Sequence, residues 1–146
     1  MTDRLAIARA YEAALFAGRM DEVGGYFTDD ITYWVAGEPP LGGVWQGRDA
    51  VVRAFANREF GLGAADWGYE ELERTWYEAD ERVIVEIHER SWLASHPDDV
   101  MDVRTCAVIR FRGDRIVEMR DYTDAQAYAG FLARHRADLP TFSGTA

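Results

Sequence analysis

Cysteine is almost absent from this sequence, in which Cys106 is the single example. One thiol excludes an internal disulfide framework and fits a reducing compartment, so we expect a cytoplasmic protein. Cys106 lies in an apolar run, which favours a small core residue over a nucleophile. The sequence also lacks a signal peptide and any apolar run long enough to span a bilayer, and we expect no membrane partner.

Positive charge is scarce as well. Lys and Arg together number 16 against 26 Asp and Glu, which gives a formal net charge of −10. This charge repels phosphate backbones and anionic lipids, so roles in nucleic-acid binding or at a membrane surface are disfavoured. Close metal-ligand spacing is lacking among the three histidines, His88, His96 and His135, and no glycine loop is built to hold phosphate. No metal site is therefore predicted.

Aromatic residues, by contrast, make up 13% of the 146 residues. Their side chains are costly to expose and suit apolar pockets and interfaces, so a cavity or a dimer surface is expected. A large aromatic core explains the same composition equally well. The length suits one domain over residues 1–146, with a loose tail at 140–146.

Hydrophobic periodicity predicts an α+β chain, in which two helices, a strand and a third helix precede four strands and a last helix. Consecutive strands with short turns indicate an antiparallel sheet, and Arg112-Gly113-Asp114 is predicted to turn one hairpin. The glycine- and proline-rich residues 36–47 are predicted to be a loop, either a lid or a pocket rim. The predicted helices are 3–17, 20–27, one that starts at 48 and ends before Gly61, and 124–136; the predicted strands are 31–35, 67–78, 82–94, 101–111 and 115–122.

Asp121 stands at the end of the apolar row of Val117 and Met119, where a strand passes into a helix. Thr123 and Gln126 have the spacing of a capping box, which predicts the start of that helix. Asp121 is then either an edge carboxylate in water or a buried acid with a raised pKa, and the second kind performs acid/base chemistry. The residues alone favour the solvated alternative.

A second polar feature lies on the strand predicted at 82–94, whose two faces differ. One face is aliphatic, and the other either meets water or lines a cavity from mouth to floor. A tryptophan at the end of a solvated row would be costly to expose, which counts against water. The aliphatic row is Val83, Val85, Ile87 and Leu93, and the polar row is Glu86, His88, Arg90 and Trp92.

Four short motifs resemble, by their order and spacing, the nuclear transport factor 2-like (NTF2-like) superfamily in its SnoaL-like branch, over about residues 4–136. The resemblance implies a cone in which a curved mixed or antiparallel sheet wraps around helices and encloses a deep apolar pocket. It also implies a homodimer and chemistry without a cofactor. The motifs are Tyr11-Glu12-Ala13-Ala14-Leu15 with Gly18, Tyr26-Phe27-Thr28-Asp29-Asp30, Gly47-Arg48-Asp49-Ala50-Val51, and Arg120-Asp121-Tyr122-Thr123-Asp124.

Among the enzymes of the superfamily, limonene epoxide hydrolase looks most similar. Asp121 occupies the position of its water-activating base, Arg90 that of its bridging arginine, and Tyr33 that of a tyrosine that helps to hold the water. Trp92 and Val35 replace its acid and its amide, so epoxide hydrolysis by that mechanism is not expected. SnoaL-type polyketide cyclases also use a carboxylate near the end of the last strand.

Ketosteroid isomerases fit less well. Tyr11 matches their first-helix oxyanion donor, but Val35 and Ala107 stand where their base and second donor are needed.

The resemblance leads to a cofactor-independent acid/base enzyme of hydrolase, cyclase or isomerase type, which acts on a hydrophobic oxygenated small molecule. Asp121 would be the general base positioned by Arg90. The proton donor would come from Tyr33, Tyr11 or His88. A non-catalytic binding protein and a purely structural dimer are the alternatives. The residues expected to line the substrate pocket are Tyr11, Trp34, Trp45, Trp92 and Met119.

Overall fold

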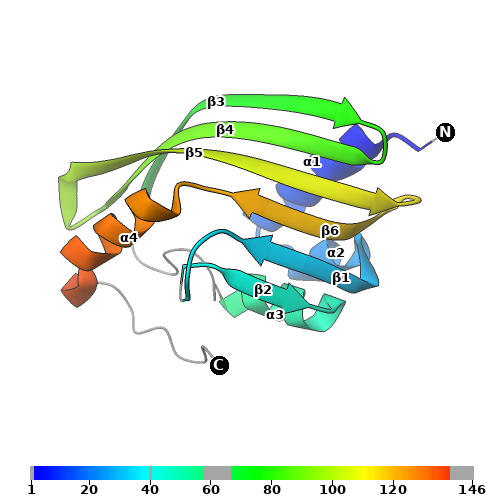
Figure 1. Ribbon diagram of the computed structural model, residues 1–146, viewed down its shortest axis with the longest axis horizontal. Helices are drawn as coiled ribbons and strands as arrows, with labels where there is room; N and C mark the ends of the chain where they lie inside the picture. The colour runs from blue at the N-terminus through cyan, green and yellow to red at the C-terminus, as the bar shows by residue number, and fades with distance from the viewer. Residues whose placement is uncertain (1, 40, 58–66, 139–146) are drawn as a thin grey trace.

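The computed structural model describes residues 2–39, 41–57 and 67–138, which form an α+β fold (Figure 1). The tail predicted at 140–146 and the helix end predicted at Gly61 lie outside these residues. The helices are α1 (Arg4–Phe16), α2 (Met20–Gly25), α3 (Arg48–Asn57) and α4 (Ala125–Arg134), with a short 3-10 helix at Arg136–Asp138. The strands are β1 (Phe27–Val35), β2 (Gly43–Gln46), β3 (Trp67–Ala79), β4 (Arg82–Leu93), β5 (His96–Arg112) and β6 (Arg115–Tyr122).

The strands form one six-stranded sheet in the order β2-β1-β6-β5-β4-β3. β3 to β6 pair antiparallel with their neighbours in sequence, which confirms that part of the prediction. The predicted hairpin is the β5–β6 pair, and Gly113 has a φ of 65° at its turn. The β1–β6 pair, however, is parallel, so the sheet is mixed. A parallel pair needs a long crossover connection, and no local turn signal could have predicted it.

The prediction of a loop over residues 36–47 is wrong for its last part, because Gly43–Gln46 form β2 and pair antiparallel with β1. This pairing covers the edge of β1 that β6 leaves open. Trp45 stands opposite Tyr33 in the register, and the two ring centroids lie 6.1 Å apart. Cross-strand aromatic packing therefore holds β2 in place despite its glycines.

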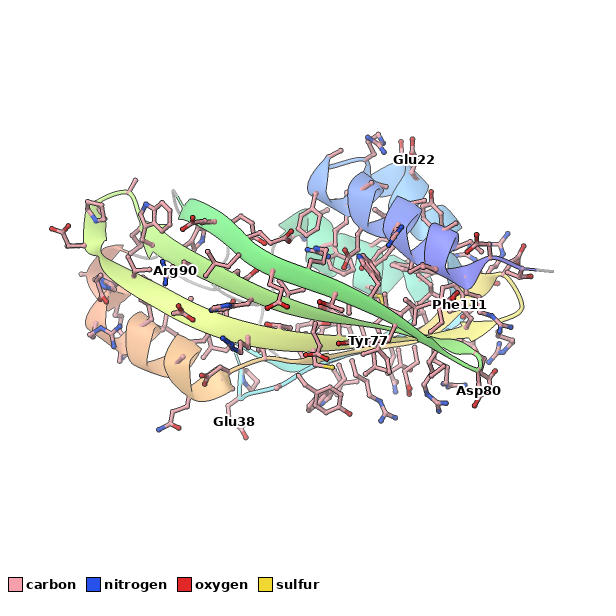
Figure 2. All side chains as sticks on the ribbon, turned by 90° about the horizontal axis from the view of Figure 1, so that it is seen from above. Glu22, Glu38, Tyr77, Asp80, Arg90 and Phe111 are labelled. Carbon is pink, nitrogen blue, oxygen red and sulfur yellow. The ribbon has the colours of Figure 1, made fainter. Side chains whose placement is uncertain are left out.

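Within the described strands, four register shifts interrupt the strand pairing and bend the sheet; they lie in the β1–β6, β3–β4, β4–β5 and β5–β6 pairs. The curved sheet carries α1 and α2 near one end and α4 at the other (Figure 1). Figure 2 shows how far the long strands reach, from Arg90 toward the α4 end to Asp80 in the β3–β4 turn. None of the helices among the described residues is long and apolar enough to cross a membrane.

Buried apolar side chains form two clusters. The larger joins α1, α2 and α3 to the sheet, and the smaller lies under α4. The larger contains Ala8, Tyr11, Ala14, Val23, Phe27, Ile31, Tyr33, Val35, Val51, Phe55, Val83, Ile109, Phe111, Ile116 and Met119. The smaller contains Leu41, Leu93, Met101, Val103 and Phe131. The boundary between the two clusters is where the candidate site lies.

The start of α4 differs from the predicted capping box. Asp124, not Thr123, is the N-cap residue, and its carboxylate accepts a hydrogen bond of 2.9 Å from the amide of Ala127. Asp is the stronger cap because its charge also suits the positive end of the helix. Thr123 instead turns its hydroxyl to that of Thr105, 2.9 Å away.

Candidate active site

Asp121 lies at the end of β6, where three strands place their side chains on a common face. In the register, Val35 of β1 and Ala107 of β5 stand opposite Asp121. Ala107 in turn stands opposite Val85 of β4. Residues that oppose one another share a face of the sheet, so Asp121 faces the helices together with the aliphatic row of β4.

Asp121 opens into a cavity of about 230 Å³ between the sheet, α4 and the segment that follows β1. The amide of Ala36 donates to the backbone oxygen of Asp121 at 3.0 Å, which ties that segment to the end of β6. Gly42 folds so tightly onto it that a Cβ would lie 2.4 Å from the Ala36 oxygen. The lining residues are Tyr33, Val35, Ala36, Leu41, Ile87, Glu89, Thr105, Asp121, Thr123, Ala125 and Tyr128.

Burial raises the pKa of Asp121 from its ordinary 3.8 to about 6. The Tyr33 hydroxyl donates a hydrogen bond to the carboxylate and opposes this rise, whereas the charge of Glu89 adds to it. A carboxylate in this state ionises near neutral pH and is a stronger base than a solvated aspartate. Asp121 is thus half-buried in the wall of a cavity and has a raised pKa, which agrees with the second alternative that the sequence left open and not with a solvated edge carboxylate.

Tyr33→Phe is expected to raise the pKa of Asp121 above about 6, because the Tyr33 hydrogen bond favours the ionised carboxylate, whereas burial and the charge of Glu89 disfavour it. A carbon-13 NMR titration of the aspartate carboxyl groups measures this pKa directly. Tyr26→Phe is the control, because Tyr26 packs edge-on against Tyr11 in the core. A pKa that falls or stays unchanged in Tyr33→Phe would contradict the role of this hydrogen bond.

Glu89 is the second carboxylate of the cavity, and the sequence analysis did not single it out. Burial raises its pKa, and hydrogen bonds from Tyr69 of β3 and Tyr128 of α4 oppose the rise. The Tyr128 oxygen lies 3.5 Å from Glu89 Oε1. The signal was available, because Glu89 comes two residues after Ile87 and thus continues the inward row of β4.

Arg90 and His88 point away from the cavity, so the predicted Arg90–Asp121 pair is not formed. Arg90 stands opposite Asp102 in the register and is next to Glu89 on the strand, so it lies on the other face of the sheet. Arg90 Nε donates to Asp102 Oδ2 at 3.1 Å, and His88 Nε2 lies 2.7 Å from Asp102 Oδ1. The polar row of β4 therefore lies on the side of the sheet that faces away from the cavity. Arg90 does not position Asp121.

The other predicted pocket residues are not among those that line the cavity. Tyr11 and Met119 are buried in the larger core cluster, and Trp45 packs against it. Trp34 pairs with Tyr122 at a centroid distance of 5.0 Å, and Trp92 packs against Gly68, where a Cβ would meet its indole at 2.0 Å. Of the residues predicted for the site, Asp121 and Tyr33 line the cavity.

A third carboxylate, Glu12 of α1, is held by Arg74 of β3. The two side chains form an ion pair and are only 14% and 17% exposed, and Arg74 also pairs with Glu71 at 2.8 Å. Burial raises the pKa of Glu12 from 4.5 to about 7, Arg74 opposes the rise, and the charge of Asp121 adds to it. Arg74 therefore forms ion pairs with two carboxylates, those of Glu12 and Glu71.

The free energy of unfolding is expected to fall as the pH rises from about 5 to about 8. Asp121 and Glu12 have raised pKa values in the folded protein, so in this range the folded chain binds protons that the unfolded chain has lost. For Asp121, the rise from 3.8 to about 6 corresponds to about 3 kcal/mol once both states are ionised. Urea unfolding across this range measures the slope, and Glu12→Gln should flatten it. Stability that increases toward pH 8 would contradict the expectation.

The described residues contain no group of three or more His, Cys, Asp or Glu side chains that could hold a metal ion. Within the described lining, the groups able to take part in a reaction are thus two carboxylates and the hydroxyls of Tyr33, Tyr128, Thr105 and Thr123. This arrangement can transfer protons in an apolar surrounding.

Solved structures of several other proteins share the fold. An NTF2-like protein from Burkholderia xenovorans has 20% identity and a TM-score of 0.73, over 88% of this chain and 94% of its own. An LEH-like epoxide hydrolase from M. tuberculosis has 18% identity and a TM-score of 0.65, over 92% of both chains. A Shewanella putrefaciens protein described as a SnoaL-like polyketide cyclase has 14% identity and a TM-score of 0.64, over 92% of this chain and 98% of its own.

No curated protein matches the chain. The family model of the SnoaL-like domain matches residues 7–119, well over half of the sequence. The structural neighbours above include enzymes of different chemistry on the same fold, so the fold agrees with an enzyme but does not name a reaction. The chain belongs to the SnoaL-like domain family and has the NTF2-like fold.

Proposed function

We propose that the protein is a cofactor-independent acid/base enzyme that acts on a hydrophobic oxygenated small molecule. The observation that carries the proposal is Asp121, a carboxylate that lines an apolar cavity and whose pKa burial raises to about 6. A general base is most effective when its pKa lies near the working pH. The similar epoxide hydrolase and polyketide cyclase support proton-transfer chemistry on this fold.

In the proposed reaction, Asp121 takes a proton from an acidic carbon or from a water molecule in the cavity. The bond to that hydrogen breaks, its electron pair stays on carbon or oxygen, and Asp121 becomes a neutral carboxylic acid. A protonated Asp121 accepts the Tyr33 hydrogen bond less strongly, so Tyr33 can turn its hydroxyl to the oxygen on which charge develops. Asp121 then returns the proton to a different atom of the product or to solvent.

A binding protein without turnover is the second candidate. Two observations favour it: Tyr33 and Tyr128 direct their hydroxyls at protein carboxylates, and Arg90 faces away from the cavity. Such a protein would use the same lining residues to hold a ligand, and its affinity would not require Asp121 to change its protonation state during a reaction.

The test is a turnover screen with epoxides, enolisable ketones and polyketide-like aromatic compounds. Wild-type protein and Asp121→Asn are compared on each compound, and binding is measured by calorimetry in parallel. Turnover that disappears in Asp121→Asn supports the enzyme. Compounds that bind without turnover support the binding protein, and turnover that persists in the variant refutes Asp121 as the base.

A further inference from the structure

The cavity is rich in hydrogen-bond acceptors and carries two carboxylates, whereas its donors point at other protein groups. Tyr33 donates to Asp121, and Tyr128 donates to Glu89. Thr123 shares its hydroxyl hydrogen bonds with Thr105 and Tyr128. The hydroxyl groups of the cavity thus already donate to protein atoms, whereas its carboxylate oxygens can still accept hydrogen bonds. A ligand that carries hydrogen-bond donors therefore fits this cavity best.

Positive charge is missing from the same lining. No arginine or histidine is among the described residues that line the cavity, and the chain has no lysine. The positive charge of Arg74 acts on Glu89 and lowers its pKa, but this guanidinium pairs with Glu12 and Glu71. Negative charge thus exceeds positive charge at the cavity wall, and a desolvated carboxylate without a cationic partner is costly.

We propose that the ligand of this cavity is a small hydrophobic amine in its protonated form, whose ammonium group donates hydrogen bonds to Glu89 and Asp121. The ammonium supplies both the missing charge and the missing donors. Tyr33 and Tyr128 also line the cavity, and an aromatic ring close to an ammonium group can add a cation–π attraction. The apolar part of the ligand packs against Val35, Leu41 and Ile87.

The volume of the cavity limits the ligand's size. About 230 Å³ is smaller than the roughly 300–1,000 Å³ typical of small-molecule pockets, which favours a single ring with a short aminoalkyl arm. The inference rests on the proposed function only for the claim that the bound amine is also the substrate. A substrate of this kind would be an oxygenated amine, whose ammonium stays on Glu89 while Asp121 transfers the proton.

Proton release on binding is a direct consequence. Burial raises the pKa of Asp121 to about 6, so near this pH about half of the unliganded molecules carry a proton on Asp121, and burial also raises the pKa of Glu89. A bound cation favours the ionised carboxylates and expels that proton. The titratable groups that act on Asp121 are Tyr33 of β1, Glu89 of β4, Tyr11 and Glu12 of α1, and Tyr128 of α4. The titratable and charged groups that act on Glu89 are Tyr69, Glu71 and Arg74 of β3 and Tyr128 of α4.

The experiment is isothermal titration calorimetry at about pH 6 with three probes of matched shape: cyclohexylmethylamine, cyclohexylmethanol and cyclohexanecarboxylate. The amine is expected to bind at least about tenfold more tightly than the alcohol, and the carboxylate is expected not to bind. Titrations in phosphate and in MES, which both buffer near pH 6 and differ in ionisation enthalpy, should show proton release with the amine alone. An alcohol that binds as tightly as the amine, a carboxylate that binds best, or no binding by any probe overturns the proposal.

Two glutamate variants locate the effect. Glu89→Gln should reduce amine affinity to the level of the alcohol and leave alcohol affinity unchanged, whereas Glu86→Gln should match wild type. Glu86 lies on the same strand but on the outer face, and it is exposed. Equal loss in both variants, or none in Glu89→Gln, overturns the assignment of the anchor. Calorimetry needs no turnover, so this inference is decided by binding alone, whereas the proposed function is decided by the turnover screen with wild type and Asp121→Asn.

Discussion

Asp121→Asn is expected to lower kcat/KM by about 10²–10⁴-fold on any compound that the protein converts, because a positioned general base contributes that much. The amide has nearly the shape of the carboxylate and still accepts the hydrogen bond from Tyr33. It cannot take a proton, however, so the loss should fall on kcat more than on KM. The measurement is steady-state kinetics on the best substrate from the screen.

Loss of activity through unfolding can be separated from loss of the base. The ionised Asp121 is destabilised by burial, so its replacement by an uncharged residue should leave the protein at least as stable as wild type at about pH 8. Urea unfolding of Asp121→Asn at that pH checks this expectation. A folded variant with unchanged turnover would falsify the assignment of Asp121 as the base.

Asp102→Asn is the matched control. Asp102 is a carboxylate of the same sheet, but it lies on the outer face and holds His88 and Arg90. If the cavity is the site, this variant should keep turnover within about twofold of wild type. A large loss in Asp102→Asn would instead place the chemistry on the outer face, where the structure has Arg90 and His88.

The pH profile gives a second check of the same base. Asp121 must be ionised to accept a proton, so kcat/KM should rise with pH through about 6 and then level off. The sign is opposite to that of stability, which falls as the same carboxylate ionises. A profile that falls through this range would mean that the protonated form of the group is the active one.

The helices, the long strands and the β5–β6 hairpin could be predicted because their signals are local. Gly18, for example, has a φ of 73° just beyond α1. Glycine adopts this left-handed conformation easily because it has no Cβ, so a glycine after a helical pattern predicts where the helix ends. Alternation likewise placed Val83 and Val85 inside. These predictions need only neighbouring residues, so one sequence is enough for them.

The site was predicted in part, because its residues meet through distant pairings. Tyr33 and Asp121 are 88 residues apart in the sequence and meet through the parallel β1–β6 pair. No turn motif and no hydrophobic periodicity in the sequence predicts that contact. It was the family resemblance that pointed to Tyr33. The same resemblance pointed to Arg90, whereas strict alternation on β4 places Glu89 inside and Arg90 outside. On β4 the motif match and the alternation of the strand gave different predictions for the inward residue, and the alternation was right.

The tryptophans show why composition alone does not locate a pocket. Aromatic residues suit cores, interfaces and cavities alike, and here Trp45 packs against the core while Trp34 pairs with Tyr122. The apolar walls of the cavity are instead aliphatic, with Val35, Leu41 and Ile87. Aliphatic residues occur throughout any core, so nothing in their type could have marked these three.

Phe131→Ala is expected to lower the free energy of unfolding by about 3–5 kcal/mol, the range for a large buried aromatic side chain. Phe131 is 0% exposed in the cluster under α4, where its ring stacks on Trp67 at 5.6 Å and lies 4.5 Å from His135. Its loss leaves a void beneath the helix that carries Tyr128 and closes the cavity. Urea unfolding followed by tryptophan fluorescence measures the change.

Phe16→Ala is the control of identical chemistry at an exposed position. The Phe16 side chain is 70% exposed at the end of α1, and Arg74 lies over its ring at 5.8 Å. Its removal should cost less than about 1 kcal/mol, the size of an exposed cation–π contact. The difference between the two Phe→Ala variants therefore isolates the burial of Phe131. Equal losses would mean that α4 is not anchored by this ring, and the wall of the cavity that holds Tyr128 against Glu89 would need another support.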